Sequence, residues 1–532
     1  MTAHAREGGL RTRLESGRFC YGVELVTTRG FVPPEKPNAV VALGQRLAAD
    51  PRVDWLSITD NPGGNVMLPP DWLGRILGAG PKPIVLHLTC KDLNRNGLES
   101  AAWRYASEGF ENILAMTGDY PRKGFGGEAT PVFDIDSVGL IQMLSAMNQG
   151  LPSPGKKGET AVLPKTNFYI GCAVSPFKRL ERELMPQYYK LLRKIAAGAR
   201  LIYTQVGYDM RKSHEVLLFL QNQGLTMPVI GNVYLLNRTV AGLFHRGQVP
   251  GCVVSAALME LCERYGRGPD KGREFFFDLA AKQLAAFRSL GFAAGYLGGT
   301  MKAETIEEII DRAERFSLDE GKEFAKEIQF GQPDEFYLFE RDPATGLGAT
   351  GQINRAYLAS LRSPHASQEN GAAYRMSRFI HDKVFTPGTP GFRLMQRLYG
   401  WLEHHPSVAR GLHRIEHAGK ALWFGCRDCG DCSLPDTAYL CPLESCSKAA
   451  RNGPCGGSRD GRCEMDDKEC IWARAYERLK GYGETEQMLD KKPVLYNAAL
   501  RGTSAWSNTF LGRDHHAAAP PPSANKKKGE SS

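Results

Sequence analysis

The first 300 residues of this 532-residue chain alternate short apolar runs with amphipathic stretches. The runs have the length and composition of buried strands and cover residues 19–25, 55–58, 83–89, 113–116, 167–173, 201–205, 229–233 and 292–297. The stretches between them carry apolar residues at helical spacing, at 38–49, 98–109, 136–148, 179–197, 212–223 and 274–290. Eight strands mostly separated by helices predict a (β/α)8 TIM barrel, with a doubly wound open sheet as the alternative. No Gly-x-Gly-x-x-Gly follows the first run, which argues against the open sheet.

The composition excludes several classes of protein. Hydrophobic residues make up 42% of the chain and charged residues 23%, as in soluble globular proteins. The sequence has no run of eighteen apolar residues and no apolar segment at its N-terminus, so we expect a cytoplasmic protein without membrane contact. The net charge of +9 is partly carried by lysines near the C-terminus and has no aromatic residues interleaved with it. Nucleic acid is therefore not an expected partner, whereas an anionic small molecule fits this charge.

Polar residues gather where five of the predicted strands end. They are Glu24, then Thr59 and Asp60, then His87 and Thr89, then Thr117, Gly118 and Asp119, and finally Gln205 with Asp209 close behind. A barrel enzyme places its chemistry at the C-terminal ends of its strands. We therefore expect these residues to ring one mouth, although a single carboxylate after a strand is more typical of a helix cap or a solvated loop.

Two of these carboxylates suggest complementary roles. Glu24 stands between Val23 and Leu25 in an apolar strand, where burial would raise its pKa and keep it protonated as an acid. Asp119 follows a glycine in a turn, where backbone amides can keep it ionised beside a developing positive charge. A salt bridge inside the barrel is the alternative for Glu24.

Eight of the thirteen cysteines crowd into residues 426–470. They are Cys426, Cys429, Cys432, Cys441, Cys446, Cys455, Cys463 and Cys470. In a reducing compartment such crowding indicates metal rather than disulfides. The spacing of the first four is similar to half of a bacterial ferredoxin run, and the last four can complete a second set. Four-thiolate sites suit an iron–sulfur cluster or zinc, and the residues leave that choice open.

Four sequence blocks occur together in the first 210 residues. They read Ser57-Ile-Thr-Asp60, Leu86-His-Leu-Thr89, Ile113-Leu-Ala-Met-Thr-Gly-Asp119-Tyr-Pro121 and Ile202-Tyr-Thr-Gln205-Val-Gly-Tyr-Asp209. In this order they resemble the blocks of methylenetetrahydrofolate reductases, over about residues 15–310. The resemblance implies a flavin-bearing barrel that reduces 5,10-methylenetetrahydrofolate to 5-methyltetrahydrofolate.

The resemblance also implies roles for single residues. Glu24 would protonate N10 of the folate, Asp119 would stabilise the resulting cation, and Gln205 would hydrogen-bond the folate. The flavin, FAD or FMN, would contact Thr59, His87, Thr117, Gly118, Asp119 and Lys194. The direct electron donor, NAD(P)H or a protein, stays open. One departure matters here: Thr117 stands where the family commonly has arginine, which removes a cation near the flavin phosphates.

The cysteine region carries a second resemblance. Phe424-Gly-Cys426, Arg451-Asn-Gly-Pro-Cys455-Gly-Gly457 and Cys470-Ile-Trp472-Ala-Arg-Ala-Tyr476 resemble the cysteine-rich partner of anaerobe-type methylenetetrahydrofolate reductases. It implies a small metal domain that relays electrons to the flavin if it holds a cluster, and is only structural if it holds zinc.

We therefore predict four parts of the chain. They are a reductase barrel at 1–315, a helical connection at 316–410, a cysteine-rich metal-binding domain at 411–485 and an extension at 486–532 that is disordered past about residue 511. Helices are expected at 306–327, 374–384, 391–404 and 408–422, and the histidines at 404, 405, 413 and 417 are more typical of helix positions than of ligands.

The function expected from these features is flavin-dependent reduction of the folate's methylene group. A folate-dependent methyltransferase or demethylase component without redox chemistry is the alternative, since the motifs after the first and fourth strands depart from the family. A non-catalytic scaffold is a third possibility. Tetrahydrofolate is the expected small-molecule partner, and an electron-donor protein and self-association are left open.

Overall fold

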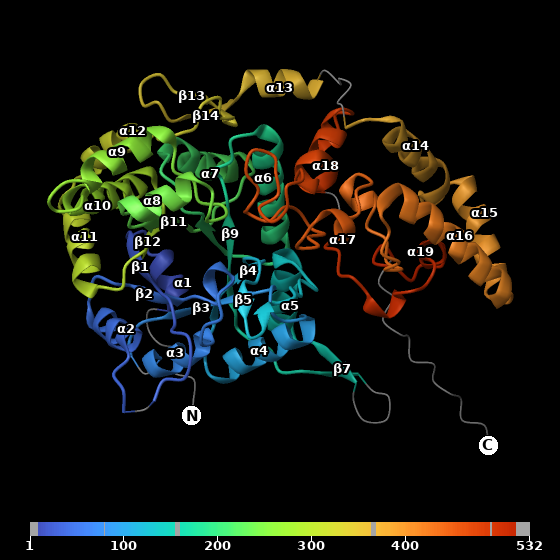
Figure 1. The fold of residues 1–532 in the computed structure, drawn as a ribbon, viewed down its shortest axis with the longest axis horizontal. Helices are drawn as coiled ribbons and strands as arrows, with labels where there is room; N and C mark the ends of the chain where they lie inside the picture. Colours follow the sequence, from blue (N-terminus) through green and yellow to red (C-terminus); the bar gives the residue numbers. More distant parts are fainter. Residues whose placement is uncertain are drawn as a thin grey trace. The chain divides into compact units, whose positions relative to one another are not determined.

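A closed barrel of eight parallel strands forms the core of the computed structural model, which describes residues 9–33, 35–78, 80–154, 160–362, 369–489 and 492–517. Its strands are β1 (Cys20–Leu25), β2 (Trp55–Ile58), β3 (Ile84–Thr89), β4 (Asn112–Met116), β9 (Tyr169–Val174), β10 (Leu201–Thr204), β11 (Val229–Tyr234) and β12 (Ala294–Gly298). They pair in that order around the barrel, and β12 closes it against β1 (Figure 1). Each predicted run overlaps one strand, so the (β/α)8 prediction is confirmed.

Helices connect the strands and surround the barrel (Figure 1). They are α2 (Ala39–Ala49), α3 (Pro70–Leu77), α4 (Arg95–Ser107), α5 (Ser137–Gln149), α6 (Glu181–Ala197), α7 (Met210–Asn222), α8 (Arg238–His245), α9 (Ala256–Gly266), α10 (Arg273–Leu290) and α11 (Ala303–Arg315). Many begin after a capping residue whose side-chain oxygen accepts from the first free amides: Asn38, Asn94, Asp136, Asp209, Asn237 and Ser255. These capping residues mark in the sequence where six of the helices begin.

The single helix predicted at 306–327 is two helices. α11 ends at Arg315 and α12 (Leu318–Glu327) begins after Ser317. Ser317 and Glu320 form a reciprocal capping box that starts the second helix. The capping box satisfies the free amides at the beginning of α12. The chain can therefore end one helix and begin another at Ser317, although the hydrophobic spacing shows no break there.

The N-terminal end of the barrel is closed by side chains. Leu10 and Leu14 of the short helix α1 (Leu10–Leu14) are buried in one cluster with Trp55 and other residues from the beginnings of the strands. Gly22 admits the Trp55 indole, since a Cβ added there would lie 2.1 Å from the ring. With this end filled, the C-terminal end is the one left for a ligand.

Smaller elements extend the barrel. Short antiparallel hairpins are formed by β5 (Lys123–Gly124) with β6 (Gly127–Glu128), by β7 (Pro152–Pro154) with β8 (Thr160–Val162), and by β13 (Phe339–Arg341) with β14 (Gly348–Ile353). Helix α13 (Arg355–Arg362) follows the last of these. Within the described ranges, no helix has both the length and the apolar character needed to cross a membrane.

Compactness divides the chain into two units. The first consists of residues 1–366 and 447–493, and the second of residues 367–446 and 494–532. This division differs from the predicted boundaries at 315, 410 and 485, because the segment 447–493 folds with the barrel. Its helix α18 (Ile471–Lys480) packs against α6, where Tyr476 Oη and Lys480 Nζ both donate to Glu181 at 2.6 Å (Figure 1).

The second unit is helical around a small aromatic core. It contains α14 (Ala372–Ile380), α15 (Pro390–Leu402), α16 (Pro406–Phe424), α17 (Pro442–Ser445) and α19 (Ala505–Phe510). The predicted helices at 374–384, 391–404 and 408–422 are thereby confirmed within a few residues. Phe510 is fully buried against Tyr399 and Leu402 of α15. The prediction that the tail is disordered past residue 511 is wrong for residues 511–517, and residues 518–532 lie outside the described part of the chain.

Candidate functional site

Glu24 lies at the C-terminal end of β1 with its carboxyl group against β12. Tyr296 Oη donates to Glu24 Oε2 at 3.3 Å, and a Cβ added at Gly298 would lie 3.2 Å from Oε1. Burial raises the pKa of Glu24 to about 6, and the tyrosine hydrogen bond partly opposes that rise. Among the described residues no cation pairs with Glu24 within 4.0 Å, so its surroundings there suit a protonated acid better than an interior salt bridge.

Asp119 follows β4 and is held by a backbone amide. The N–H of Gly63, in the loop after β2, donates to Asp119 Oδ2 at 2.7 Å. Cys252, in the loop between α8 and α9, is affected by both acids: burial, together with the charges of Asp119 and Glu24, raises its pKa to about 12. The two carboxylates therefore lie within electrostatic range of one buried thiol, as expected for groups at a common mouth.

Two of the proposed flavin contacts are buried in the barrel wall. His87 Nε2 lies 2.8 Å from Ser57 Oγ, and burial together with Lys91 lowers the pKa of His87 to about 3. Lys194 Nζ donates to the carbonyl of Ala173 at 2.6 Å, and burial lowers its pKa to about 8. His87 is thus a neutral hydrogen-bonding group, and Lys194 is a weak cation near neutral pH.

The other proposed flavin contacts lie at the ends of β2 and β4. Thr59 is buried beside the carbonyl of Leu25, and Thr117 Oγ1 lies 3.2 Å from Ser137 Oγ. Gly118 has φ +89°, and a Cβ added there would lie 2.9 Å from Thr89 Cβ. Glycine is required at this turn for both reasons.

A buried lysine at the end of β3 was missed by the sequence analysis. Lys91 Nζ donates to Thr89 Oγ1 at 2.7 Å and to the carbonyl of Asp60 at 3.0 Å. Thr89 Oγ1 in turn donates to Asp60 Oδ2 at 2.6 Å. Asp60 therefore links the ends of β2 and β3. The side chain of Lys91 also packs against Gly118.

Gln205 and Asp209, both predicted at the mouth, have different surroundings. A Cβ added at Gly251 would lie 2.9 Å from Gln205 Nε2 and 3.1 Å from the carbonyl of Gly456. Gln205 therefore lies close to the loop that contains Gly251, which also approaches Gly456. Asp209 instead caps α7 by accepting from the amide of Arg211 at 2.8 Å, and it accepts from Tyr337 Oη at 2.6 Å. Its carboxylate is a structural cap.

Buried cations fasten the segment 447–493 to the barrel. Lys178 Nζ donates to the carbonyl of Gly456 at 2.7 Å, and Lys190 Nζ donates to that of Gly453 at 3.0 Å. Gln187 Nε2 donates to the carbonyl of Cys455 at 2.5 Å. Lys178 follows β9 and the other two residues belong to α6, so residues 453–456 run across the C-terminal side of the barrel.

The buried ion pair of Lys448 and Glu464 reaches the β4 turn. Their side chains are 5% and 4% exposed, and Lys448 Nζ also donates to the carbonyl of Gly118 at 2.9 Å. Although burial lowers the pKa of Lys448, the charges of Cys455, Glu464 and Asp119 raise it overall. Glu464 Oε1 lies 3.6 Å from Cys455 Sγ. Lys448 thus brings a positive charge to the turn that contains Thr117, Gly118 and Asp119.

A cavity of about 390 Å³ opens beside these contacts. Its lining includes Phe177, Lys178, Gly251, Cys252, Cys463 and Glu464. The volume falls within the roughly 300–1,000 Å³ of small-molecule sites. The lining therefore includes Cys252, whose pKa is affected by Glu24 and Asp119, and Cys463 of the segment 447–493.

Four of the predicted metal-ligating cysteines form an electrostatic group in the second unit. The charge of Cys432 acts on Cys426 and Cys441, and that of Cys429 acts on Cys432 and Cys441. Burial raises the pKa of Cys441 to about 11. Although burial lowers the pKa of Lys420, the charges of Cys432 and its other acidic neighbours raise it overall.

Backbone amides point at the sulfurs of this group. Burial raises the pKa of Cys426 and of Cys432, and the nearby amides of Asp428 and Leu434 partly oppose that rise. Cys441 accepts from two amides at the beginning of α17. Such N–H groups stabilise thiolates, which are the forms that bind metal.

The other predicted ligands are divided between the units. Cys455, Cys463 and Cys470 belong to the barrel's unit, and Cys446 is the last residue before the segment 447–493. In the described ranges no three cysteine sulfurs lie within 4.8 Å of one another. A tetrahedral zinc site with Zn–S bonds of about 2.3 Å would place its sulfurs roughly 3.8 Å apart. The described sulfurs are therefore spaced more widely than one zinc ion requires.

Sequence comparison decides the family. The family model of methylenetetrahydrofolate reductase matches residues 10–313, more than half of the chain. This chain belongs to the methylenetetrahydrofolate reductase family. A second model, described as the C-terminal region of methylenetetrahydrofolate reductase, matches residues 405–496. Both resemblances seen in the sequence are thereby confirmed, and the family's barrel and its cysteine-rich region are joined in one chain.

Two solved structures that match this family member are only distantly similar to it. A protein from Clostridium thermocellum that binds two copies of 5-methyl-5,6,7,8-tetrahydrofolic acid is 12% identical with a TM-score of 0.40, over 57% of this chain and 96% of that one. A 2,3-dimethylmalate lyase is 10% identical with a TM-score of 0.32, over 57% and 85%. These values are too low to carry an argument about function. Comparison with curated proteins gave no match.

Proposed function

We propose that this protein reduces 5,10-methylenetetrahydrofolate to 5-methyltetrahydrofolate at the C-terminal mouth of its barrel. The observation that carries the proposal is Glu24, a buried carboxyl group with a raised pKa that lies within electrostatic range of the same thiol as Asp119. A proton donor and an anion in one mouth are what opening of the folate's imidazolidine ring requires.

Glu24 supplies the proton for ring opening. Its proton passes to N10 of the folate, the bond between N10 and the methylene carbon breaks, and the bonding electrons stay on N10. Burial keeps Glu24 protonated near pH 6, and Tyr296 holds the carboxyl group in place through the 3.3 Å hydrogen bond. Such positioned proton transfer commonly contributes about a hundred- to ten-thousand-fold to the rate.

Asp119 stabilises the positive charge that ring opening leaves on the folate. The Gly63 amide fixes its carboxylate at 2.7 Å, so little reorganisation is needed when the charge develops. Gln205, directly after β10 and beside Gly251, offers an amide to the folate.

The barrel mouth fits a flavin. Ser175, directly after β9, has a buried hydroxyl oxygen without a hydrogen-bond partner among the described residues. Thr59, Thr117 and Lys194 lie around the same end of the barrel. A bound flavin supplies the hydride that converts the methylene carbon to methyl, while the protein supplies orientation and charge.

The cysteines fit a thiolate-ligated centre that takes up electrons. Cys426, Cys429, Cys432 and Cys441 affect one another's charge and have a neighbouring lysine, and backbone amides lie near Cys426, Cys432 and Cys441. Their spacing exceeds that of a single tetrahedral ion, which favours an iron–sulfur cluster over zinc. We propose a thiolate-ligand role for Cys455, Cys463 and Cys470 of the barrel's unit on the same chemical grounds, and Cys463 lines the cavity at the barrel.

Absorption spectroscopy tests the cofactor assignment. Anaerobically purified protein should show oxidised-flavin bands and a broad cluster shoulder, both bleached by dithionite. A colourless protein that still binds 5-methyltetrahydrofolate would contradict the reductase assignment and favour methyl transfer without redox chemistry.

The folate half-reaction should decline as the pH rises through about 6. The pKa of Glu24 is raised from 4.5 to about 6, so the proton that it donates is present below that pH and is lost above it. We expect the rate of reduced-flavin oxidation by the folate to fall towards tenfold per pH unit above pH 6, measured by anaerobic stopped flow. A rate that is flat between pH 5 and 8 would remove Glu24 as the donor.

Cys432→Ser should remove iron from the first cysteine set. Serine oxygen is a poorer ligand for iron–sulfur clusters than thiolate. We expect lower iron content and a weaker cluster shoulder, with the flavin retained. Cys262→Ser, in α9 and apart from the cysteine-rich region, is the matched control and should keep its iron. Iron-free protein that loses zinc in Cys432→Ser but not in Cys262→Ser would show that the region is structural.

A further inference from the structure

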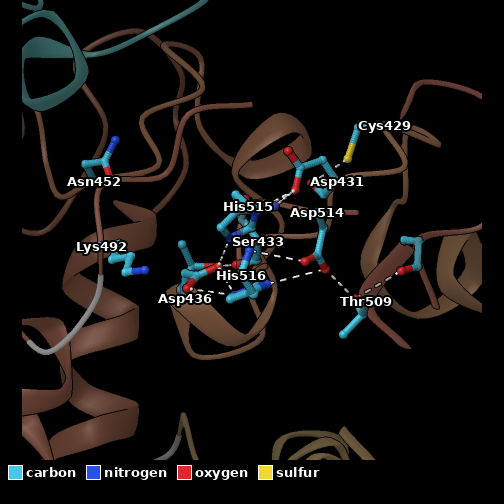
Figure 2. A network of polar contacts seen from close by, with 12 residues as sticks. Cys429, Asp431, Ser433, Asp436, Asn452, Lys492, Thr509, Asp514, His515 and His516 are labelled. Atoms are coloured by element: carbon cyan, nitrogen blue, oxygen red, sulfur yellow. Dashed lines mark hydrogen bonds and ion pairs between the residues drawn. The ribbon is translucent and has the colours of Figure 1, made fainter. Parts of the chain in front are cut away.

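Two consecutive histidines of the C-terminal segment meet an aspartate of the cysteine-rich loop in the second unit (Figure 2). His515 Nε2 lies 3.0 Å from Asp436 Oδ2, and His516 Nε2 lies 3.3 Å from Asp436 Oδ1. One donor atom from each of the three residues falls within 4.8 Å of the others. Among the described residues, this is the set of histidine, cysteine and acidic side chains that is compact enough to hold one ion.

Each imidazole has a second carboxylate behind it. His515 Nδ1 lies 2.5 Å from Asp431 Oδ1, and His516 Nδ1 lies 3.5 Å from Asp514 Oδ2, so the two rings stand between an inner and an outer carboxylate (Figure 2). A metal-bound histidine typically donates its other ring N–H to a carboxylate, which fixes the ring and its tautomer. Both rings of this site have that arrangement, with Asp436 on the inner side of each.

The outer carboxylates are themselves held in place. Asp431 Oδ2 accepts from the amide of Asn497 at 2.9 Å, and Asp514 Oδ2 accepts from Thr509 Oγ1 at 2.5 Å. The side chains of Asp431 and Asp514 are 0% and 1% exposed. The side chain of His516 is 38% exposed. The outer carboxylates are therefore buried, whereas the site is open to solvent at His516.

We propose that Asp436, His515 and His516 bind one divalent transition-metal ion, of which zinc is the best match. Two imidazole nitrogens and one carboxylate oxygen are ligands that zinc favours, and a water on the exposed side completes a tetrahedron. The site is chemically separate from the thiolates, and both histidines lie beyond residues 405–496 that match the family's C-terminal model.

The ion ties the C-terminal segment to the cysteine-rich loop. Asp431 and Asp436 belong to the loop that carries Cys429 and Cys432, and Cys429 Sγ lies 3.2 Å from the carbonyl of Asp431. The histidines come from the segment that follows α19. Binding therefore links two stretches separated by about eighty residues, and it holds the loop in the conformation that presents its thiolates.

Zinc stoichiometry of the full-length protein tests the site. After dialysis against zinc and removal of the weakly bound excess, wild type should hold one more equivalent than His515→Gln/His516→Gln. His404→Gln/His405→Gln, a second consecutive pair in the same unit, should match wild type. His405 Nδ1 faces the carbonyl of Trp401 at 3.0 Å rather than a carboxylate. Equal zinc in all three proteins would overturn the proposal and leave the histidines as partners of the carboxylates only.

Two further measurements guard against misfolding of the double variant. Asp431→Asn keeps all three ligands and should weaken zinc binding by about ten- to a hundredfold, as outer carboxylates commonly do. Cobalt added to wild type should give visible bands without the thiolate charge-transfer band that the cysteine sets produce, and those bands should be missing in His515→Gln/His516→Gln. Thiolate bands alone would assign the extra ion to the cysteines and contradict the site.

Discussion

Glu24→Gln should slow the folate half-reaction by about a hundred- to ten-thousand-fold, the range of general acid catalysis. Glutamine keeps the shape of the side chain and the contact with Tyr296 but has no acidic proton for N10. Flavin content and reduction of the flavin should be unchanged, because neither uses that proton. Anaerobic stopped flow separates the two half-reactions, and a loss confined to the folate step is the expected result.

Tyr296→Phe is the matched control for this variant. The tyrosine hydrogen bond lowers the pKa of Glu24, so its removal should raise that pKa further. We expect the folate half-reaction to persist and its decline to move to higher pH. Full turnover by Glu24→Gln would exclude Glu24 as the acid, whereas loss of flavin from this variant would show that Glu24 is structural.

Lys448→Met should lower the free energy of unfolding of the barrel unit by about 3–5 kcal/mol, the usual cost of removing one partner of a buried pair. Glu464 is 4% exposed and would be left as an unpaired carboxylate, and the carbonyl of Gly118 would lose its donor. The segment 447–493 should also become more accessible to protease. Denaturant unfolding of the purified protein measures the first effect.

Two variants decide what that loss means. Arg462→Met removes a partner of Asp467 in the same segment, but these side chains are 54% and 93% exposed, so the cost should stay below about 1 kcal/mol. The double variant Lys448→Met/Glu464→Met removes both charges and should recover much of the stability. If Lys448→Met unfolds like Arg462→Met, the pair does not fasten the segment to the barrel.

The barrel was predictable because its signals are local. Each strand is a short apolar run, and capping residues such as Asn38, Asn94 and Asp136 begin the helices next to their strands. The mouth residues followed from the rule that barrel chemistry lies at strand ends. Even there, the local sequence did not distinguish the role of Glu24, whose buried carboxyl group suits proton donation, from that of Asp209, which caps a helix.

The rest depended on contacts between distant parts of the chain. Lys448 is 330 positions from Gly118, and no spacing rule links them. His515 and His516 stand in a polar, alanine-rich stretch that reads as a disordered tail, yet they meet Asp431 and Asp436 about eighty residues earlier. In each case a buried charge meets a partner that lies far away in the sequence.

A single-turnover experiment tests the reductase assignment most directly. Dithionite-reduced protein, freed of excess reductant, is mixed anaerobically with 5,10-methylenetetrahydrofolate, and the flavin spectrum and the folate products are followed together. The account predicts that one 5-methyltetrahydrofolate forms for each flavin that returns to the oxidised state. Folate binding with neither flavin oxidation nor methyl product would contradict it.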